Sequence, residues 1–321
     1  MRDISPVMST PGLVSIILPT FNRAGLLPRA IDSVLNQSYQ EWELLVWNDG
    51  SSDDTEKVVQ FYADPRIRLF SESNHGKPYA LNQALHRANG EYIAFLDDDD
   101  EWTKEKLTLQ VGFLRDNSEL ALVFGNFINV DHFKQKTGLG FEQTASGLEK
   151  LTTTEKANGW KVIYNGFLEG LCTENFIAFD TILARKGLFT SLGGFNESLK
   201  SSEDFEFWWR FGLAKKLAAF SHDVMMIRNK YPGSLSGGEA SSLKNVLDAL
   251  AVCVEDSHRL GQPQTLRLLR KLYRNQWQNL IKAYGEEGKK SEAVHAFFRS
   301  LRYGLRLGSV RLLLEALIGI N

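Results

Sequence analysis

A short apolar run that ends in four consecutive aspartates constrains this chain more than any other feature. Residues 92–96 have the length and composition of a buried strand, and residues 97–100 are all aspartate. Four carboxylates in one place repel one another unless a cation or hydrogen-bond donors compensate their charge. Hard divalent cations take oxygen ligands, and a nucleoside diphosphate commonly completes the coordination of Mg²⁺. The run therefore predicts a metal and nucleotide site, with a solvated acidic turn as the alternative.

Strand-like and helix-like segments alternate through the first hundred residues. Strands are expected at residues 14–18, 42–47, 67–70 and 92–96, with helices at 28–36, from 53 onward and at 78–88. This alternation predicts a mainly parallel sheet with helices on both faces. Polar clusters follow three of these strands, and ligands bind beyond the carboxyl ends of parallel strands. We therefore expect the clusters at residues 19–23, 48–51 and 97–100 to meet at one edge of the sheet.

Length and composition place the chain among globular proteins. Its 321 residues, 43% of them hydrophobic, suffice for one large domain or two ordinary ones. Cys172 and Cys253 form no disulfide framework, and nowhere do 18 apolar residues run together, so a cytoplasmic setting without a membrane span is expected. From residue 257 onward, 12 Lys and Arg stand against 4 Asp and Glu. This basic tail favours an anionic membrane surface or a phosphorylated partner, with a solvated helix face as the alternative.

Several stretches in a fixed order resemble the family 2 glycosyltransferases, which have the GT-A fold. They are VSIILPTFNR, VWNDGSSDDT, NHGKPYALNQAL, GEYIAFLDDDDEW and GGFNESLKSSEDFEFWWR, and together they span roughly residues 12–236. The resemblance implies an α/β, Rossmann-like catalytic domain at residues 1–236. Its nucleotide-sugar half is expected at about 12–126 and its acceptor half at 127–236. Residues 237–321 are expected to form a helical C-terminal region.

The resemblance also implies an activity. It is the inverting, metal-dependent transfer of a sugar from a nucleotide diphosphate sugar, expected to be a UDP-sugar, to a hydroxyl acceptor. The resemblance implies a saccharide or lipid-linked acceptor and a role in surface polysaccharide or glycoconjugate synthesis. It also implies a Mg²⁺ or Mn²⁺ cofactor and a place at the inner face of the plasma membrane. Peripheral membrane contact or a homodimer through the C-terminal helices is a further expectation. No nucleic-acid-binding motif accompanies the basic tail, so nucleic acid is not an expected partner.

The family motifs assign donor-binding roles to residues of the first loops. Thr20 and Phe21 match the loop that contacts the nucleoside, where an aromatic ring either lies against the base or covers the sheet edge. Arg23 is expected to pair with phosphate or to cap a helix. Asp49 matches the acid that accepts the N3 hydrogen of uracil, and shaping its own Asp-Gly turn is the alternative. Gly76 would let the backbone approach the nucleotide closely.

The acidic run and the lysine before it complete the expected donor site. Lys77 would meet phosphate or remain solvated. The resemblance implies that Asp97 or Asp98 hydrogen-bonds the ribose hydroxyls and that Asp99 binds the metal, in a register that is ambiguous by one residue. Asp100 is expected to turn away and begin the next helix, where an acid near the N-terminus is favourable.

A second acidic motif matches the acceptor side of the family's site. The resemblance implies that Asp204 is the general base that takes the proton from the acceptor hydroxyl, so that a single displacement inverts the anomeric carbon. Glu203 is expected to contact the acceptor or the diphosphate. Tyr231, which stands where the family often has histidine, has the same expected role. The alternative for Glu203 and Asp204 is that both acids cap a helix.

Two other classes of protein fit parts of this pattern. A nucleotidyltransferase-type nucleotide-sugar enzyme also needs an acidic metal site, but it would carry a Gly/Arg/Lys-rich phosphate loop near its N-terminus, which this sequence lacks. A non-catalytic sugar-nucleotide or carbohydrate-binding module on the same fold is the second, and the retained Asp99 and Asp204 argue against it. A Rossmann dehydrogenase would need G-x-G-x-x-G after the first strand, where the chain has PTFNR.

Overall fold

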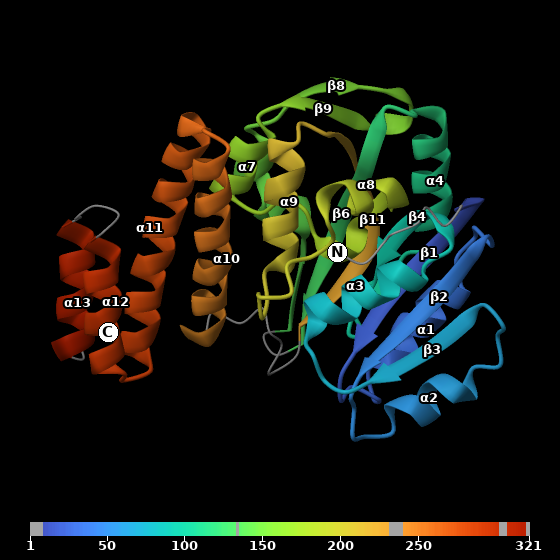
Figure 1. Ribbon diagram of the computed structural model, residues 1–321, viewed down its shortest axis with the longest axis horizontal. Helices are drawn as coiled ribbons and strands as arrows, with labels where there is room; N and C mark the ends of the chain where they lie inside the picture. Colours follow the sequence, from blue (N-terminus) through green and yellow to red (C-terminus); the bar gives the residue numbers. More distant parts are fainter. Residues whose placement is uncertain (1–8, 133–134, 231–239, 302–306, 319–321) are drawn as a thin grey trace. The chain divides into compact units, whose positions relative to one another are not determined.

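The computed structural model describes residues 9–132, 135–230, 240–301 and 307–318 (Figure 1). These residues form two compact units. The first unit comprises the described residues of Met1–Glu197 and Phe211–Pro232, and the second those of Ser198–Arg210 and Gly233–Asn321.

The first half of the sheet is parallel, as the alternating pattern predicts. Its strands are β1 (Thr10–Thr20), β2 (Trp42–Asp49), β3 (Ile67–Glu72) and β4 (Gly90–Phe95), which lie in the order β3-β2-β1-β4 with every pair parallel. The connecting helices are α1 (Leu27–Leu35), α2 (Thr55–Phe61) and α3 (Lys77–Arg87). Every residue of β2 is buried, which is why its sequence is nearly continuously apolar rather than alternating.

The second half of the sheet is mixed. Its strands are β5 (Glu101–Trp102), β6 (Leu120–Asp131), β7 (Lys136–Leu139), β8 (Thr152–Glu155), β9 (Lys161–Asn165), β10 (Leu183–Arg185) and β11 (Leu217–Lys230). β10 pairs antiparallel with both β4 and β6, so it joins the two halves, whereas β6 and β11 pair in parallel. In the described part of the chain this gives one sheet of eleven strands, with both β5 and β9 antiparallel to β11.

Helices of the first unit flank this sheet (Figure 1). They are α4 (Lys106–Asp116), α5 (Gly140–Gln143), α6 (Ala145–Leu148), α7 (Phe167–Thr173) and α8 (Lys186–Leu192), with 3₁₀ turns η1 (Ala157–Gly159) and η2 (Phe179–Thr181). The core that they enclose includes the central residues of β1 and β4. The predicted α/β sheet with flanking helices is confirmed.

The second unit is helical. It contains most of α9 (Glu203–Leu213), together with α10 (Ala240–Arg259), α11 (Pro263–Glu286), α12 (Lys290–Ser300) and α13 (Leu307–Ile318). α11 packs against α10, α12 and α13, and its buried residues Leu269, Tyr273, Trp277 and Leu280 recur every three or four positions. The predicted helical C-terminal region is confirmed. Among the described helices, none combines the length and the apolar character that crossing a membrane would require.

Candidate active site

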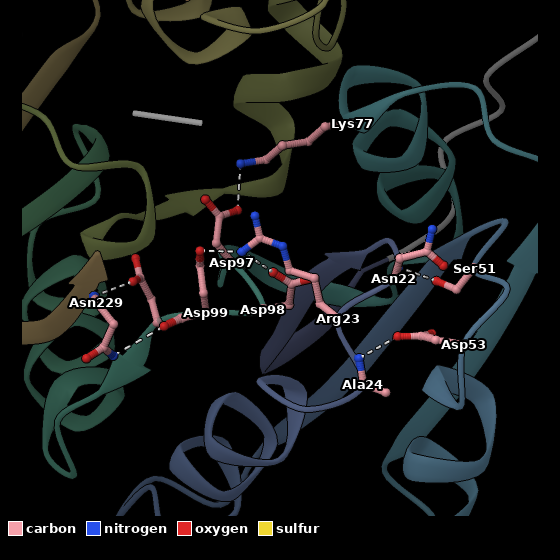
Figure 2. Close-up of polar contacts among 11 residues, drawn as sticks. Asn22, Arg23, Ala24, Ser51, Asp53, Lys77, Asp97, Asp98, Asp99 and Asn229 are labelled. Carbon is pink, nitrogen blue, oxygen red and sulfur yellow. Dashed lines mark hydrogen bonds and ion pairs between the residues drawn. The ribbon is translucent and has the colours of Figure 1, made fainter. Parts of the chain in front are cut away.

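The loops after β1 and β2 are bonded to each other at the carboxyl edge of the parallel strands (Figure 2). The backbone N–H of Asn22 donates to Ser51 Oγ at 2.8 Å, and that of Ala24 donates to Asp53 Oδ2 at 3.0 Å. In return, Asn22 Oδ1 accepts the N–H of Ser52 at 2.7 Å. Asn22 has φ +54°, a left-handed conformation that asparagine tolerates better than most residues. The first two polar clusters therefore lie together.

Arg23 connects these loops to the acidic run. Its Nη1 lies 2.5 Å from Asp99 Oδ2 and 3.7 Å from Asp98 Oδ1. Figure 2 draws Arg23 beside these two aspartates. The guanidinium is only partly exposed, so the ion pair is screened less than a surface pair would be. The structure thus places the Arg23 guanidinium against the acidic run, while the Arg23 carbonyl accepts the N–H of Leu27 at the start of α1.

Lys77 faces the acidic run from the start of α3 (Figure 2). Its Nζ lies 2.6 Å from Asp97 Oδ1 and 4.9 Å from the centroid of the Phe179 ring, so this lysine is not merely solvated. Gly76 is the N-cap residue of α3 with φ +93°, a conformation that side chains other than glycine's rarely adopt. The glycine is therefore needed for the turn that aims Lys77 at Asp97.

The four aspartates alternate between two environments. Asp97 and Asp99 are half-buried and face Lys77 and Arg23, whereas Asp98 and Asp100 are buried. Burial raises the pKa of Asp98 to about 7, although the Thr20 hydroxyl and the Arg23 guanidinium favour its ionised form. The protein therefore compensates the negative charge of this loop only in part.

The expectation that Asp100 begins the next helix is wrong. The short strand β5 follows the acidic run, and α4 begins only at Lys106. Asp100 is buried, and its Oδ1 accepts the backbone N–H of Asn229 on β11 at 2.9 Å. Asn229 Nδ2 also donates to the Asp99 carbonyl at 3.2 Å (Figure 2). A buried hydrogen bond to a distant strand thus replaces the expected helix cap.

The acidic run has the chemistry of a divalent-cation site without being a complete cage. In the described part of the chain, no group of three or more His, Cys, Asp or Glu residues could hold a metal ion. Mg²⁺, however, is commonly bound through one or two carboxylates, with phosphates and water as its other ligands. The hard oxygens of Asp97 and Asp99 fit that pattern, and they already attract the two cations beside them.

Asp49 holds the loop that precedes α3. Its Oδ1 accepts the N–H of His75 at 2.8 Å and its Oδ2 accepts that of Gly76 at 2.9 Å. A Cβ atom on Gly50 would lie 2.7 Å from the Asn74 backbone nitrogen, so the Asp-Gly sequence also permits this close approach. Each carboxylate oxygen keeps a free lone pair, so recognition of uracil by Asp49 stays a prediction.

Thr20 and Phe21 end β1 in different environments. Thr20 is buried, and its hydroxyl favours the ionised form of the nearby Asp98 carboxyl without forming a hydrogen bond of ordinary geometry to any described residue. Phe21 is 45% exposed, which is unusual for so large an apolar side chain at the end of a core strand. Stacking of the Phe21 ring on the nucleobase stays a prediction.

The model described as Glycosyl transferase family 2 matches residues 15–168. This range contains β2, β3, β4 and most of β1, together with the three bonded loops and the acidic run. Residues 15–168 of this chain belong to glycosyl transferase family 2.

Relatives and solved structures of several organisms resemble this family 2 protein. The UDP-Glc:alpha-D-GlcNAc-diphosphoundecaprenol beta-1,3-glucosyltransferase WfgD of Escherichia coli is 43% identical over 116 residues, which are 36% of this chain and 46% of WfgD. TarS of S. aureus in complex with UDP-GlcNAc matches with TM-score 0.59 at 18% identity, over 95% of this chain and 92% of TarS. The mannosyltransferase PcManGT from Pyrobaculum calidifontis, in complex with GDP-Man and Mn²⁺, matches with TM-score 0.57 at 19% identity, over 96% and 80% of the two chains.

These comparisons establish the fold, and they establish the family of residues 15–168. At such low identities the structural matches show the fold alone, and the predicted GT-A fold is confirmed. The chain spans less than two thirds of the length of the first curated relatives that it matches.

Two of the expected acceptor-side residues belong to the second unit. Glu203 and Asp204 occupy the first turn of α9 in the second unit, where Glu203 is buried and Asp204 half-buried. Acids are favourable at that end of a helix, so the capping alternative stays open. The placement of Asp204 opposite Asp99 stays a prediction, and Tyr231 lies outside the described residues.

Sequence reasoning missed several residues of the site. Asn22 and Ser51 bond the first two loops, and their residue types alone signal only turns. Asp53 stands where a helix was expected to begin, and it accepts both the N–H of Thr55 and that of Ala24. Asn229 lies 129 residues from Asp100 within a strand, and no local pattern indicates their contact.

Proposed function

We propose that this family 2 protein transfers a sugar from a nucleotide diphosphate sugar to the hydroxyl of a saccharide or lipid-linked acceptor. The observation that carries the proposal is the acidic run at the carboxyl edge of the parallel strands, with Arg23 and Lys77 facing it. A UDP-sugar is the proposed donor, supported by the UDP-Glc in the name of WfgD and by the UDP-GlcNAc bound to TarS. The acceptor proposal, in surface polysaccharide or glycoconjugate synthesis, is supported by the diphosphoundecaprenol in the name of WfgD.

The donor-binding residues have separable proposed roles. Arg23 and Lys77 would donate charge-assisted hydrogen bonds to the diphosphate, because each is a cation held at the rim of the acidic run. Asp97 or Asp98 would accept hydrogen bonds from the ribose hydroxyls. Asp99 would hold Mg²⁺ or Mn²⁺, supported by the Mn²⁺ in PcManGT. When bound, such an ion supplies charge neutralisation for the departing nucleoside diphosphate.

The proposed chemistry is a single displacement. The acceptor oxygen forms a bond to the anomeric carbon while the bond from that carbon to the diphosphate oxygen breaks, which inverts the configuration. Asp204 would take the proton of the acceptor hydroxyl, and Glu203 or Tyr231 would contact the acceptor or the diphosphate. The proposed catalytic domain is residues 1–236, and residues 237–321 are the proposed helical accessory region.

Ligand-induced stabilisation tests the donor assignment. A ligand that binds only the native state raises its melting temperature, by an amount set by concentration and affinity. Thermal-shift measurements with UDP-, GDP- and dTDP-sugars, each with Mn²⁺, with Mg²⁺ and with EDTA, should show a metal-dependent shift for the UDP-sugar. If no nucleotide sugar shifts the protein under any of these conditions, the donor assignment is wrong.

Substitution of the proposed base separates catalysis from binding. Asp204→Asn should abolish transfer and leave the shift by UDP-sugar intact, because the amide cannot take a proton. The matched control is Asp54→Asn, at an exposed acid paired with Lys57 on the surface. A wild-type protein that binds donor but transfers no sugar to any acceptor tested would favour the non-catalytic module instead. A wild-type protein that instead joins a nucleotide to a sugar phosphate would favour the nucleotidyltransferase class.

The C-terminal helices have a proposed role at the membrane. Arg267, Arg270 and Lys271 are exposed on α11, and Arg274 follows on the same face at helical spacing. Glu286, at the C-terminal end, is the only acid of α11. We assign this basic face to anionic lipid at the inner side of the plasma membrane, where a lipid-linked acceptor would be found. The cytoplasmic setting is supported by the two free cysteines, Cys172 and Cys253.

Vesicle co-sedimentation tests this basic face. Replacing Arg267, Arg270 and Lys271 by glutamine should abolish binding to vesicles that contain phosphatidylglycerol. The control replaces Lys57, Lys215 and Lys216, which are exposed in the first unit, so the net charge falls equally. Equal loss in both variants would contradict a specific face. Dimers in sedimentation velocity without any vesicle binding would assign the face to a second copy of the chain.

A further inference from the structure

Asn229, near the end of β11, lies between the acidic run and the end of β6. It is 5% exposed, so its amide depends on hydrogen-bond partners within the protein. Strand β5, which follows the acidic run, pairs with β11 at Met226 and Ile227. Strand β6 pairs with β11 in parallel as far as Asp131, which lies opposite Lys230. The side chain of Asn229 therefore has neighbours on both β5 and β6.

The side-chain nitrogen of Asn229 contacts two acceptors at the acidic run. Its Nδ2 donates to the Asp99 carbonyl at 3.2 Å and to Glu101 Oε1 at 3.1 Å. Figure 2 shows the contact between Asn229 and Asp99. A carbonyl oxygen and a carboxylate oxygen both accept hydrogen bonds, so the NH₂ group of the amide must face this side.

The side-chain oxygen of Asn229 faces His132 at the end of β6. Asn229 Oδ1 and His132 Nε2 lie 2.8 Å apart, and the His132 backbone N–H donates to the Lys230 carbonyl at 3.1 Å. An amide oxygen only accepts, so the imidazole donates from Nε2. Turning the amide over would set donor against donor and acceptor against acceptor. The orientation of this side chain is therefore fixed from both sides.

The backbone of Asn229 makes a separate contact with the acidic run. Its N–H donates to Asp100 Oδ1 at 2.9 Å. This bond does not involve the Asn229 side chain, so it persists when the side chain is substituted. The contacts to Asp99 and Glu101 can therefore be removed while Asp100 stays bonded to β11.

The main chain of the acidic run is held at both ends. The N–H of Leu96, the residue before the run, donates to the Ile17 carbonyl on β1 at 3.0 Å. Asn229 supplies the corresponding bond near the other end, on the Asp99 carbonyl. That carbonyl is attached to the Cα atom that bears the Asp99 carboxylate. Fixing this peptide therefore limits the directions in which the carboxylate can point.

The same amide reaches a second side of the acidic run through Glu101. Arg29 Nη1, on α1, lies 3.6 Å from Glu101 Oε1, the oxygen that also accepts a hydrogen bond from Asn229. Helix α1 follows the loop that carries Arg23, whose guanidinium pairs with Asp99. Asn229 is thus part of a network that holds both the backbone of Asp99 and the helix after its cationic partner.

We propose that Asn229 is a positioning residue of the transfer reaction, whose amide holds the Asp99 backbone and so aims the Asp99 carboxylate at the metal ion of the donor complex. This inference rests on the proposed function. The side-chain oxygen of Asn229 is committed to His132, so the residue acts through Asp99 rather than as a ligand itself. Outer partners that orient a metal ligand commonly contribute about 10- to 100-fold in metal affinity or activity.

The test replaces Asn229 by leucine, which keeps most of the volume but neither donates nor accepts hydrogen bonds. In Asn229→Leu we expect kcat/KM to fall by about 10- to 100-fold and the Mn²⁺ concentration for half-maximal rate to rise by a similar factor. In the absence of turnover, the thermal shift caused by UDP with Mn²⁺ should shrink, while the shift caused by UDP with EDTA stays at the wild-type value. If Asn229→Leu does not fold, Asn229→Ala, which adds no volume, takes its place with the same expectations.

Asn126→Leu is the matched control for a purely structural effect. Asn126 is also 5% exposed, and its Oδ1 accepts the N–H groups of Phe127 on β6 and Phe141 on α5, each at 2.9 Å. This variant should lower the melting temperature and leave the Mn²⁺ dependence of both the rate and the UDP shift unchanged.

Three outcomes would overturn the positioning role. They are a wild-type Mn²⁺ dependence in the Asn229 variant, an equal change in Asn126→Leu, and wild-type turnover that EDTA does not affect. A wild type that neither binds donor nor transfers sugar would instead contradict the proposed function, which is a separate result.

Discussion

Glu43 and Asp98 are both buried carboxylates of the parallel sheet, yet their surroundings act on them in opposite ways. Glu43 lies near the start of β2 and accepts hydrogen bonds from Ser15 Oγ at 2.6 Å, Arg68 Nη1 at 2.8 Å and the Asn89 backbone at 2.6 Å. Burial acts to raise its pKa, but these donors outweigh burial and lower it. Asp98 follows β4 at the other end of the strands, and burial dominates there, raising its pKa to about 7.

The contrast separates a structural acid from a functional one. The protein supplies enough donors at the amino end of the strands to keep Glu43 ionised without any ligand. At the carboxyl end it leaves negative charge that a cation would compensate. Perturbed carboxylates of the second kind cluster at functional sites, which agrees with the placement of the acidic run.

In the comparison of these two acidic sites, the largest expected effect is the loss of turnover in Asp99→Asn. The amide keeps the shape of the side chain but removes the charge that would hold the metal, so kcat/KM should fall by about 10²- to 10³-fold. The melting temperature without ligand should change little, because the Arg23 pair is partly exposed to water. Steady-state assays and thermal melts check both parts. A variant with unchanged turnover would place the metal elsewhere.

Glu43→Gln should show the opposite profile. Losing the charge weakens the hydrogen bonds from Ser15, Arg68 and Asn89, which are buried or partly buried, and we expect the free energy of unfolding to fall by about 2–3 kcal/mol. Urea denaturation measures this loss. Turnover of the folded fraction should match the wild type, and a variant that lost activity while keeping its stability would erase the distinction between the two acids.

The pH dependence of stability should differ in sign between the two acids. The pKa of Asp98 is raised in the native state, so its ionisation opposes folding, and stability without ligand falls as the pH rises from about 4 to about 7. The pKa of Glu43 is lowered, so its contribution is present above about pH 4.5 and is lost as the pH falls through the lowered value.

Asp98→Asn isolates the Asp98 contribution. At pH 8 this variant should be more stable than wild type by roughly 1–2 kcal/mol in the free energy of unfolding, and it should melt at a higher temperature, because the desolvated charge is gone. The loss of some contacts to Thr20 and Arg23 reduces this gain. The advantage should disappear at pH 4, where the wild-type carboxyl is protonated. Thermal melts across this range test the prediction, and a lower melting temperature at pH 8 would contradict it.

The smallest expected effect is that of Lys77→Met. Its ion pair with Asp97 is about one third exposed, so stability should change by less than about 1 kcal/mol. The KM for donor should rise by about tenfold if the ammonium binds the diphosphate. Lys57→Met, at the exposed pair with Asp54, is the control and should leave both quantities unchanged. Equal KM values in the two variants would remove Lys77 from the donor site.

Local patterns predicted the parallel half of the fold and much less of the rest. The βα alternation placed β1 to β4 and brought the three polar clusters to one edge, because parallel connections fix which strand ends meet. The mixed half depends on pairing over long separations: three-residue β10 sits between β4 and β6, far from both in sequence. No period or motif in so short a strand signals its partners.

The limits of prediction at the site have the same cause. The acidic run was recognisable as four carboxylates, but the inward turn of Asp100 involves a hydrogen bond from Asn229, which is remote in sequence. The sequence did not decide whether Lys77 meets phosphate or stays solvated, whereas the structure pairs it with Asp97. Motifs thus identified which residues gather, while the direction of each side chain came from long-range packing.

The bonds that tie Asn22 to Ser51 and Ala24 to Asp53 are made between protein groups alone. Much of the nucleoside-facing backbone is therefore ordered during folding, and little conformational entropy remains to be lost when a nucleotide arrives. Calorimetry on nucleotide binding should consequently record a small heat-capacity change and a modest entropic penalty, as expected for a preformed receptor.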